Sequence, residues 1–281
     1  MTIPSNPEML ELLSTNRIIM GRGGLGGFAY RVDPSAPYMA TAIHAGGKVR
    51  DALLPLMKIG PEERYFEEDP ATDTMIQGAA SAVWGLDSRS EYDLNRPSTE
   101  ALPLTPEQFW GVQVYMRQPG QRMNRESLAK YHQFYEFMGS WAASTLAKFG
   151  VCLVYDVHAY NITRQIQKGI SSPPVFNLGT AGIDRRRWAA LVENWLVRLK
   201  EIEIPGVQTT VAENCVFQGK GELCRRMTQW DPRILVLPTE ISKVYMDETK
   251  GAIHSKAVEA LKKGLGRAMR EHSKVFLQLY G

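Results

Sequence analysis

The pattern of hydrophobic and polar positions changes repeatedly between two periods along the chain. Six segments are apolar runs or alternate apolar with polar residues, as strands do: residues 28–32, 38–44, 151–157, 174–180, 207–214 and 233–240. Five others follow the spacing of amphipathic helices: residues 6–16, 74–83, 105–146, 184–202 and 250–280. This alternation predicts an α/β fold with one domain over residues 1–281, in which helices flank a mixed, mostly parallel sheet.

Local signals mark several helix ends. Residues 105–107 read Thr-Pro-Glu, which is typical of a helix cap and first turn. A break follows at Pro119, and a long amphipathic helix occupies about residues 125–148. Gly150 ends that helix, so the apolar run that follows it is predicted to be a buried strand.

Residues 21–27 read Gly-Arg-Gly-Gly-Leu-Gly-Gly, a spacing that suggests a dinucleotide-binding loop. Such a loop needs a strand before it, a helix after it and an acidic residue further on. Here the strand-like segment 28–32 follows instead of a helix. We therefore predict a flexible turn at this position.

Composition and charge are those of an ordinary globular protein. Hydrophobic residues make up 44% of the 281 residues and charged residues 22%. The net charge of +3 arises from 33 basic and 30 acidic residues without long runs of one sign. We therefore do not expect nucleic acid as a main partner.

The cysteines Cys152, Cys215 and Cys224 lack the paired spacing of a metal site. Their odd number indicates free thiols in a reducing compartment. No apolar run is long enough to span a membrane, and residues 1–7 lack the basic region and apolar core of a signal peptide. We therefore expect a cytoplasmic protein without a membrane partner; the sequence leaves the oligomeric state open.

Three of the predicted strands end in residues that can bind metal or move protons. His44 follows one apolar run, His158 ends another, and Glu240 ends a third. In open α/β sheets, ligands bind beyond the carboxyl ends of the strands. A single histidine at a strand end is more often structural, but three such ends together indicate a functional site.

An acidic cluster lies between the first of these strand ends and the helix predicted at 74–83. It contains four carboxylates: Glu67, Glu68, Asp69 and Asp73. Acidic residues before a helix interact favourably with its dipole, so capping explains most of them. One of the four can nevertheless complete a metal site.

Two histidines and one carboxylate are a usual ligand set of a catalytic zinc, which keeps a fourth position for water. We therefore predict one Zn²⁺ per chain, with His44 and His158 among its ligands. Such an ion activates the water and polarises a carbonyl, while a further carboxylate passes the proton to a leaving nitrogen.

Two polar loops are candidates for substrate binding. The segment 88–97 contains Arg89, Asn95 and Arg96. Their planar guanidinium groups and side-chain amide can donate hydrogen bonds to a substrate carboxylate. The loop 215–222 has glycines that permit close approach to a ligand, and Lys220 could neutralise an anion. Ordinary surface loops are the alternative for both segments.

Several motifs occur in a distinctive order along the chain. They are Ile-His-Ala-Gly at 43–46, Glu-Glu-Asp-Pro-Ala-Thr-Asp at 67–73, Asp-Leu-Asn-Arg at 93–96, Asp-Val-His at 156–158 and Glu-Ile-Ser-Lys-Val-Tyr-Met-Asp-Glu at 240–248. In this order the chain resembles the N-formylglutamate amidohydrolase family from about His44 to Glu248. The resemblance implies a fold like that of zinc carboxypeptidases and aspartoacylase, and a metal-dependent hydrolase of C–N bonds other than peptide bonds.

The resemblance also implies roles for particular residues. His44 and His158 would bind zinc, and Glu240 would be the general base. The third ligand would come from the acidic cluster; we favour Glu68, with Glu67 and Asp73 as alternatives. Arg89 would stabilise the oxyanion, and the substrate-binding residues would be Asn95, Arg96, Asn214, Lys220 and Tyr245.

The chain departs from the family pattern at two places near the expected substrate. The motif around His158 reads Asp-Val-His-Ala, where the family usually has Asp-Cys/Ala-His-Ser. The loop after Asn214 reads Cys-Val-Phe-Gln-Gly-Lys-Gly, where the family usually has Pro-Phe-Lys/Ala-Gly-Gly. The substrate is therefore left open as a small N-acyl amino acid, a modified peptide or a specialised metabolite, and a binding protein without turnover is the non-enzyme alternative.

Overall fold

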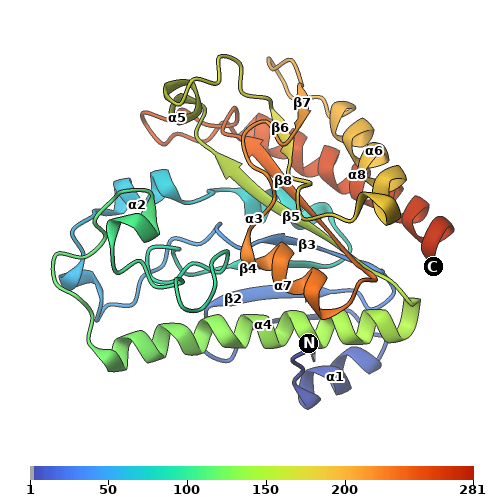
Figure 1. Ribbon diagram of the computed structural model, residues 1–281, viewed down its shortest axis with the longest axis horizontal. Coiled ribbons are helices and arrows are strands. Elements are labelled where there is room, and N and C mark those ends of the chain that lie inside the picture. The colour runs from blue at the N-terminus through green and yellow to red at the C-terminus, as the bar shows by residue number, and fades with distance from the viewer. Residues whose placement is uncertain (1–2) are drawn as a thin grey trace.

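The computed structural model describes residues 3–281. Met1 and Thr2, which begin the segment 1–7 that lacks the features of a signal peptide, lie outside the described residues. An eight-stranded mixed sheet forms the middle layer of the molecule (Figure 1). Its strands, in spatial order, are β1 (Ile19–Arg22), β2 (Phe28–Val32), β4 (Ala82–Gly85), β3 (Tyr38–Ala42), β5 (Cys152–Tyr160), β8 (Ile234–Ser242), β6 (Phe176–Leu178) and β7 (Val211–Glu213).

The central strands of this sheet run parallel. β3 pairs in parallel with both β4 and β5, and β5 pairs in parallel with β8. Antiparallel pairs flank this centre, with β1–β2 and β2–β4 on one side and β8–β6 on the other. The predicted mixed α/β sheet is confirmed, and the carboxyl ends of β3, β5 and β8 lie at one edge of it.

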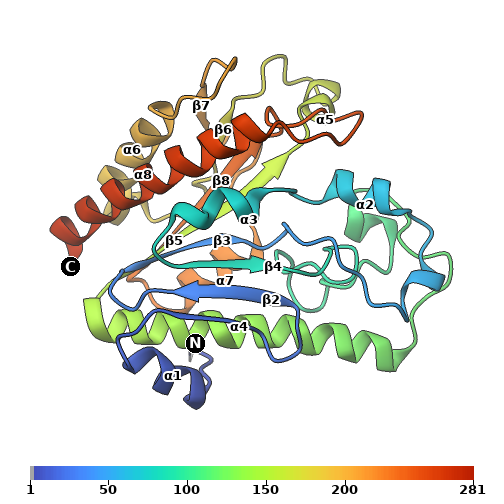
Figure 2. The same cartoon turned by 180° about the vertical axis from the view of Figure 1, so that it is seen from behind.

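Helices cover both faces of the sheet (Figures 1 and 2). They are α1 (Pro7–Ser14), α2 (Pro61–Glu67), α3 (Thr72–Met75), α4 (Gln121–Phe149), α5 (Ile162–Gln167), α6 (Arg185–Lys200), α7 (Glu222–Trp230) and α8 (Ser255–Tyr280), with short 3-10 helices η1 (Leu54–Leu56), η2 (Ile76–Gly78) and η3 (Pro106–Phe109). α3, α6 and α8 pack in the core on one face. α4 and α7 pack in the core on the other face, where α1 lies beside α4.

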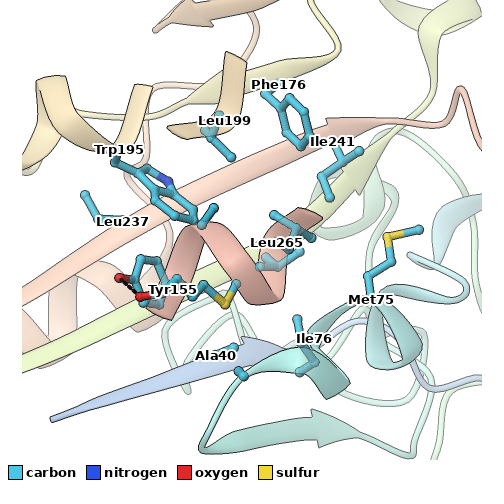
Figure 3. Close-up of a cluster of buried hydrophobic side chains, with 14 of the residues drawn as sticks. Ala40, Met75, Ile76, Tyr155, Phe176, Trp195, Leu199, Leu237, Ile241 and Leu265 are labelled. Atoms are coloured by element: carbon cyan, nitrogen blue, oxygen red, sulfur yellow. Dashed lines mark hydrogen bonds between the residues drawn. The ribbon is translucent and has the colours of Figure 1, made fainter. Parts of the chain in front are cut away.

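The core under α6 and α8 is rich in large side chains. Tyr155, Trp195 and Leu265 are fully buried there (Figure 3). Trp195 Nε1 donates a hydrogen bond to Thr239 Oγ1 at 3.0 Å, which satisfies the buried N–H. Because each such side chain contributes roughly 1.5–3 kcal/mol on burial, this packing holds β5 and β8 firmly in place.

The long helix α4 has the end that the sequence predicts. Gly150 adopts a left-handed conformation with φ of 73° and donates its N–H to the carbonyl of Leu146 at 2.9 Å. The helix begins at Gln121, directly after the break at Pro119. Within the described part of the chain, no helix combines the length and the apolar character needed to cross a bilayer.

The prediction of a helix at residues 74–83 is wrong. The chain there forms the short helix α3, the 3-10 turn η2 and then strand β4, which inserts between β2 and β3. Gly78 lies against Gly266 of α8, where a side chain at either position would collide with the other backbone. Met75 and Ile76 are instead buried in the core on the α8 side of the sheet.

Other predicted boundaries are also corrected. Residues 105–119 form only the turn η3 and loops, and α8 begins at Ser255 rather than near residue 250. The strands predicted at 174–180 and 207–214 shorten to β6 and β7. The glycine-rich segment 21–27 overlaps β1 and turns into β2, so it is a hairpin and not a phosphate loop.

Candidate active site

The residues at the three predicted strand ends face one pocket of about 420 Å³. His44 lies just beyond β3, and His158 on β5 is directly opposite Glu240 on β8 in the parallel register. Side chains alternate between the faces of a strand, so Glu240 lines the pocket while Ile241 packs in the core. The parallel sheet thus brings together residues that are far apart in the sequence.

Asp69 joins the two histidines in a buried group of three possible metal ligands. The Nδ1 atoms of His44 and His158 are 3.2 Å apart. Asp69 Oδ2 lies 3.3 Å from His158 Nδ1 and 3.5 Å from His44 Nδ1. These three atoms surround one point at the floor of the pocket.

Glu68, the carboxylate favoured from the sequence, is not part of this group. It is the C-cap residue of α2, and its buried carboxylate lies beside Gly47. Asp69 is turned toward the site instead, because its N–H donates to the carbonyl of His44 at 2.9 Å. The segment between α2 and α3 is irregular, so no periodicity indicates which of its carboxylates faces the histidines.

The two alternative carboxylates also lie outside the group. Glu67 lines the pocket but is paired with Arg164 of α5 through both of its oxygens. Asp73 lies in the first turn of α3, where an acidic residue interacts favourably with the helix dipole. The favourable interaction with the helix dipole therefore explains the position of Asp73, although the N-cap residue of α3 is Ala71.

A second carboxylate lies behind each histidine. Asp93 Oδ1 is 2.8 Å from His44 Nε2. Asp156 Oδ2 is 3.1 Å from His158 Nε2. Because the Nε2 atoms face these carboxylates, the Nδ1 atoms of both rings are directed at Asp69.

The charges in this group shift the pKa values of its members. Burial acts to raise the pKa of Asp69, but hydrogen bonds from His158 and His44 outweigh it and hold that pKa below its usual range. Burial acts to lower the pKa of His158, but Asp156 and Asp69 raise it well above its usual value. Several carboxylates around two imidazoles thus favour a bound cation or protonated rings.

Glu240 stands beside this group in the pocket wall. Burial raises its pKa to about 8, and the nearby carboxylates of Asp69 and Asp156 contribute to the increase while His158 opposes it. A carboxyl group that titrates near neutral pH can both accept and return a proton. This property suits the role of general base.

The predicted arginines gather around Asp93. Arg89 Nη2 donates to Asp93 Oδ2 at 2.7 Å, and Arg96 Nε lies 3.7 Å from the same oxygen. Both arginines line the pocket. One buried carboxylate therefore holds two arginines and the ring of His44.

Asn95 and Lys220 lie on the same wall of the pocket. The backbone N–H of Asn95 donates to Asp93 Oδ1 at 2.8 Å, and its side-chain oxygen accepts from Leu223 N at 3.3 Å. Gly221 packs so closely on the Asn95 amide that a Cβ there would clash. The glycine loop and the arginine segment therefore form one continuous wall.

Asn214 and Tyr245 are not among the residues that line the pocket. Asn214 is exposed, with φ of 54°, and its amide bonds to the backbone N–H and the hydroxyl of Thr180, each at 2.8 Å. Tyr245 is fully buried in the hydrophobic core. The structure therefore places neither side chain at the surface of this pocket.

Trp110, Arg164 and Lys243 are among the pocket residues that the sequence-based site does not include. Arg164 and Trp110 lie in segments without a strand-end or motif signal. Lys243 lies inside the motif at 240–248, and this position is the one sequence feature that could have indicated its place in the pocket. The carboxylates Asp93 and Asp156 likewise occur within the recognised motifs, but their contacts with the histidines follow only from the fold.

The fold and the pocket together define the class of this protein as an α/β protein whose candidate site lies beyond the carboxyl ends of its central parallel strands. The model of the N-formylglutamate amidohydrolase family matches residues 36–246, well over half of the chain. The chain therefore belongs to the N-formylglutamate amidohydrolase family, and it is a hydrolase of C–N bonds other than peptide bonds.

Solved structures share this fold at low sequence identity. An N-formylglutamate amidohydrolase from Ralstonia eutropha is 17% identical with a TM-score of 0.70, over 89% of this chain and 97% of that one. A gene product of Agrobacterium tumefaciens is 15% identical with a TM-score of 0.61, over 91% and 96% of the two chains. No curated protein sequence matches the chain.

Proposed function

We propose that this protein is a zinc-dependent amidohydrolase that cleaves the acyl–nitrogen bond of a small N-acyl amino acid, with N-formyl amino acids such as N-formylglutamate as the first candidates. The observation that carries this proposal is the convergence of His44, Asp69 and His158 beside Glu240 in one pocket. The family indicates the type of bond that is cleaved. The Ralstonia relative is named an N-formylglutamate amidohydrolase, so N-formylglutamate is the first substrate to test.

The spacing of the three side chains fits a tetrahedral zinc ion. Ligand atoms at about 2.0–2.2 Å from such an ion lie roughly 3.3–3.6 Å from one another. The separations between the Nδ1 and Oδ2 atoms of His44, His158 and Asp69 are 3.2, 3.3 and 3.5 Å. We therefore assign Asp69, in place of Glu68, as the third ligand.

The residues around the ligands support the same assignment. Metal-binding histidines commonly direct their second ring nitrogen at a carboxylate, which fixes the orientation of the ring. Asp93 forms such a hydrogen bond behind His44, and Asp156 lies behind His158 at 3.1 Å as an ion-pair contact without hydrogen-bond geometry. A purely structural histidine pair would not require a separate carboxylate for each ring.

The chemistry of hydrolysis can then be divided among the pocket residues. Bound zinc supplies a Lewis acid that activates water and polarises the acyl carbonyl. Glu240 takes the proton of the attacking water and delivers it to the leaving nitrogen. Arg89 faces the developing negative charge on the acyl oxygen, and its guanidinium is held in place by Asp93.

The amino-acid part of the substrate would bind along the wall formed by Asn95, Arg96 and Lys220. All three line the pocket and offer donors for a carboxylate. Asn214 and Tyr245 have no part in this binding, because neither lines the pocket. The altered glycine loop lies in this wall, so it bears on which N-acyl amino acid is preferred.

Metal analysis of the purified protein tests the metal site. We expect about one zinc per chain in the wild type and its loss in His44→Ala and His158→Ala. Asp69→Asn should lose zinc, whereas the matched variant Glu68→Gln should keep it. Loss of zinc from Glu68→Gln but not from Asp69→Asn would show that Glu68 is the third ligand. Absence of zinc from the wild type after reconstitution would disprove the proposal.

A substrate comparison tests the reaction. Formyl, acetyl and peptidyl derivatives of glutamate and of other amino acids should be assayed with the zinc-loaded protein, and release of the free amino group measured. We expect hydrolysis of at least one N-acyl amino acid. Ligand binding without any hydrolysis would support the binding-protein alternative instead.

A further inference from the structure

Trp110 lies over the two arginines of the pocket. The centre of its ring is 4.0 Å from Arg89 Cζ and 5.9 Å from Arg96 Cζ. A guanidinium at such a distance from an aromatic face is attracted by the ring's quadrupole. Trp110 is 39% exposed and lines the pocket, so it lies between the arginines and solvent.

The backbone of Trp110 is unusual for a large residue. It has φ of 50° and ends the turn η3, and Gly111 follows with φ of 85°. A bulky side chain rarely adopts this left-handed conformation, which is strained and typical of functional sites. Phe109 is fully buried with Val114 and Tyr115, so a small hydrophobic cluster anchors the turn and directs Trp110 toward the pocket.

The guanidinium of Arg89 is thus held on two sides. Asp93 binds its Nη2 at 2.7 Å, and the Trp110 ring covers it. Its Nε is buried and has no hydrogen-bond partner among the described residues. Asp93 also contacts His44 at 2.8 Å, so Trp110, Arg89 and Asp93 form a continuous chain of contacts to a proposed metal ligand.

We propose that Trp110 is a positioning residue that orients Arg89, and to a lesser extent Arg96, for the substrate by a cation–π contact. This inference rests on the proposed function, because it assigns the two arginines to the acyl oxygen and the carboxylate of the substrate. The left-handed backbone at Trp110 places the ring on the arginines. The aromatic face itself, and not the bulk of the side chain, is the feature that matters.

The matched variants Trp110→Phe and Trp110→Leu test the aromatic face. Both place a Cβ in the same strained backbone, but only phenylalanine keeps a ring. We expect kcat/KM to fall about tenfold in the leucine variant, mainly through kcat because Arg89 lies nearer, and to stay within about threefold of wild type in the phenylalanine variant. Equal activity of the two variants would overturn the proposal.

The variant Trp110→Gly separates positioning from folding. Glycine relieves the strain at φ of 50°, so we expect an unchanged or higher Tm together with the same loss of kcat/KM as in the leucine variant. Asn16→Gly, at an exposed position with φ of 54°, is the control for a change to glycine in the left-handed region; it also removes the acceptor of Lys148 Nζ and should leave activity unchanged. Loss of zinc or a lower Tm in Trp110→Gly would show a structural role and overturn the proposal.

The same variants distinguish this inference from the proposed function. If the wild type hydrolyses no N-acyl amino acid, the proposed function fails, and the affinity of the zinc-loaded protein for L-glutamate is measured by calorimetry instead. Weaker binding in Trp110→Leu than in Trp110→Phe would still support the contact with the arginines. Equal binding by both variants would refute it.

Discussion

At the scale of single residues, the position of Glu240 is decided by strand alternation. Pro238 and Glu240 line the pocket, whereas the intervening Thr239 bonds to Trp195 in the core and Ile241 is buried beyond. A shift of one residue in the pairing of β8 would turn Glu240 into the core. The parallel register with His158 therefore places the proposed general base.

Glu240→Gln keeps the size of the side chain and removes its ability to accept a proton. We expect kcat to fall by roughly 100-fold or more, while the zinc content and KM stay close to wild type. Steady-state kinetics and metal analysis measure both. Glu259→Gln, on the exposed side of α8, is a control for the same substitution outside the pocket; turnover retained in Glu240→Gln would remove the assigned role.

At the scale of elements, Lys243 connects β8 to the segment that delivers Asp69. Its side chain is buried, and Nζ donates to the carbonyls of Phe66 and Glu68, each at 2.8 Å. Burial lowers the pKa of this lysine to about 8. Lys243 thus ties down the irregular chain between α2 and α3 at the point where it turns toward the histidines.

Lys243→Met fills similar space but leaves both carbonyls without this donor, which costs roughly 1–3 kcal/mol for each group that stays unsatisfied. We expect zinc affinity to fall about 10–100-fold, as for other residues that orient metal ligands. Competition with a chelator measures the affinity, and Lys263→Met on exposed α8 is the control. A folded Lys243→Met protein with wild-type zinc affinity would contradict this role.

At the scale of the whole molecule, His272 connects two helices on one face of the sheet to a central strand. It lies on α8, where Nδ1 is 2.8 Å from the hydroxyl of Tyr155 on β5 and Nε2 is 2.9 Å from the carbonyl of Leu191 on α6. The ring is fully buried. Burial lowers its pKa to about 4, so it stays neutral in the folded protein over most of the pH range.

This shift predicts a loss of stability in acid. Above pH 6.5, the histidine is neutral in both states and contributes no pH dependence. Between about pH 6.5 and 4, the unfolded chain binds a proton that the folded chain does not, so the free energy of unfolding falls by up to about 3 kcal/mol. Urea denaturation at a series of pH values measures this decrease.

His272→Gln should be less stable at pH 8, because core contacts are lost, yet its stability should fall less steeply between pH 6.5 and 4. His132→Gln, at an exposed position of α4, should follow the wild type. Identical pH dependence in the wild type and His272→Gln would show that this histidine does not cause the acid sensitivity.

The sequence alone determined the α/β class, the strands β5 and β8, the long helix α4 with its glycine stop, and the histidines and glutamate at the strand ends. These features depend on local signals, since burial on both faces produces apolar runs and a left-handed helix end requires glycine. The family motifs were equally local. Residues that carry such signals were therefore available without the fold.

Only the tertiary structure decided the remaining parts of the site. Strand β4 forms because β2 and β3 pair with it, and its apolar residues alone had suggested a helix. Asp69 rather than Glu68 faces the histidines because α2 ends at Glu67 and the backbone that follows is irregular. Hydrogen bonds to Lys243 and His44 hold this backbone in place. The direction in which a side chain points from such an irregular segment depends on contacts with residues that are distant in the sequence. No hydrophobic periodicity in the sequence indicates that direction.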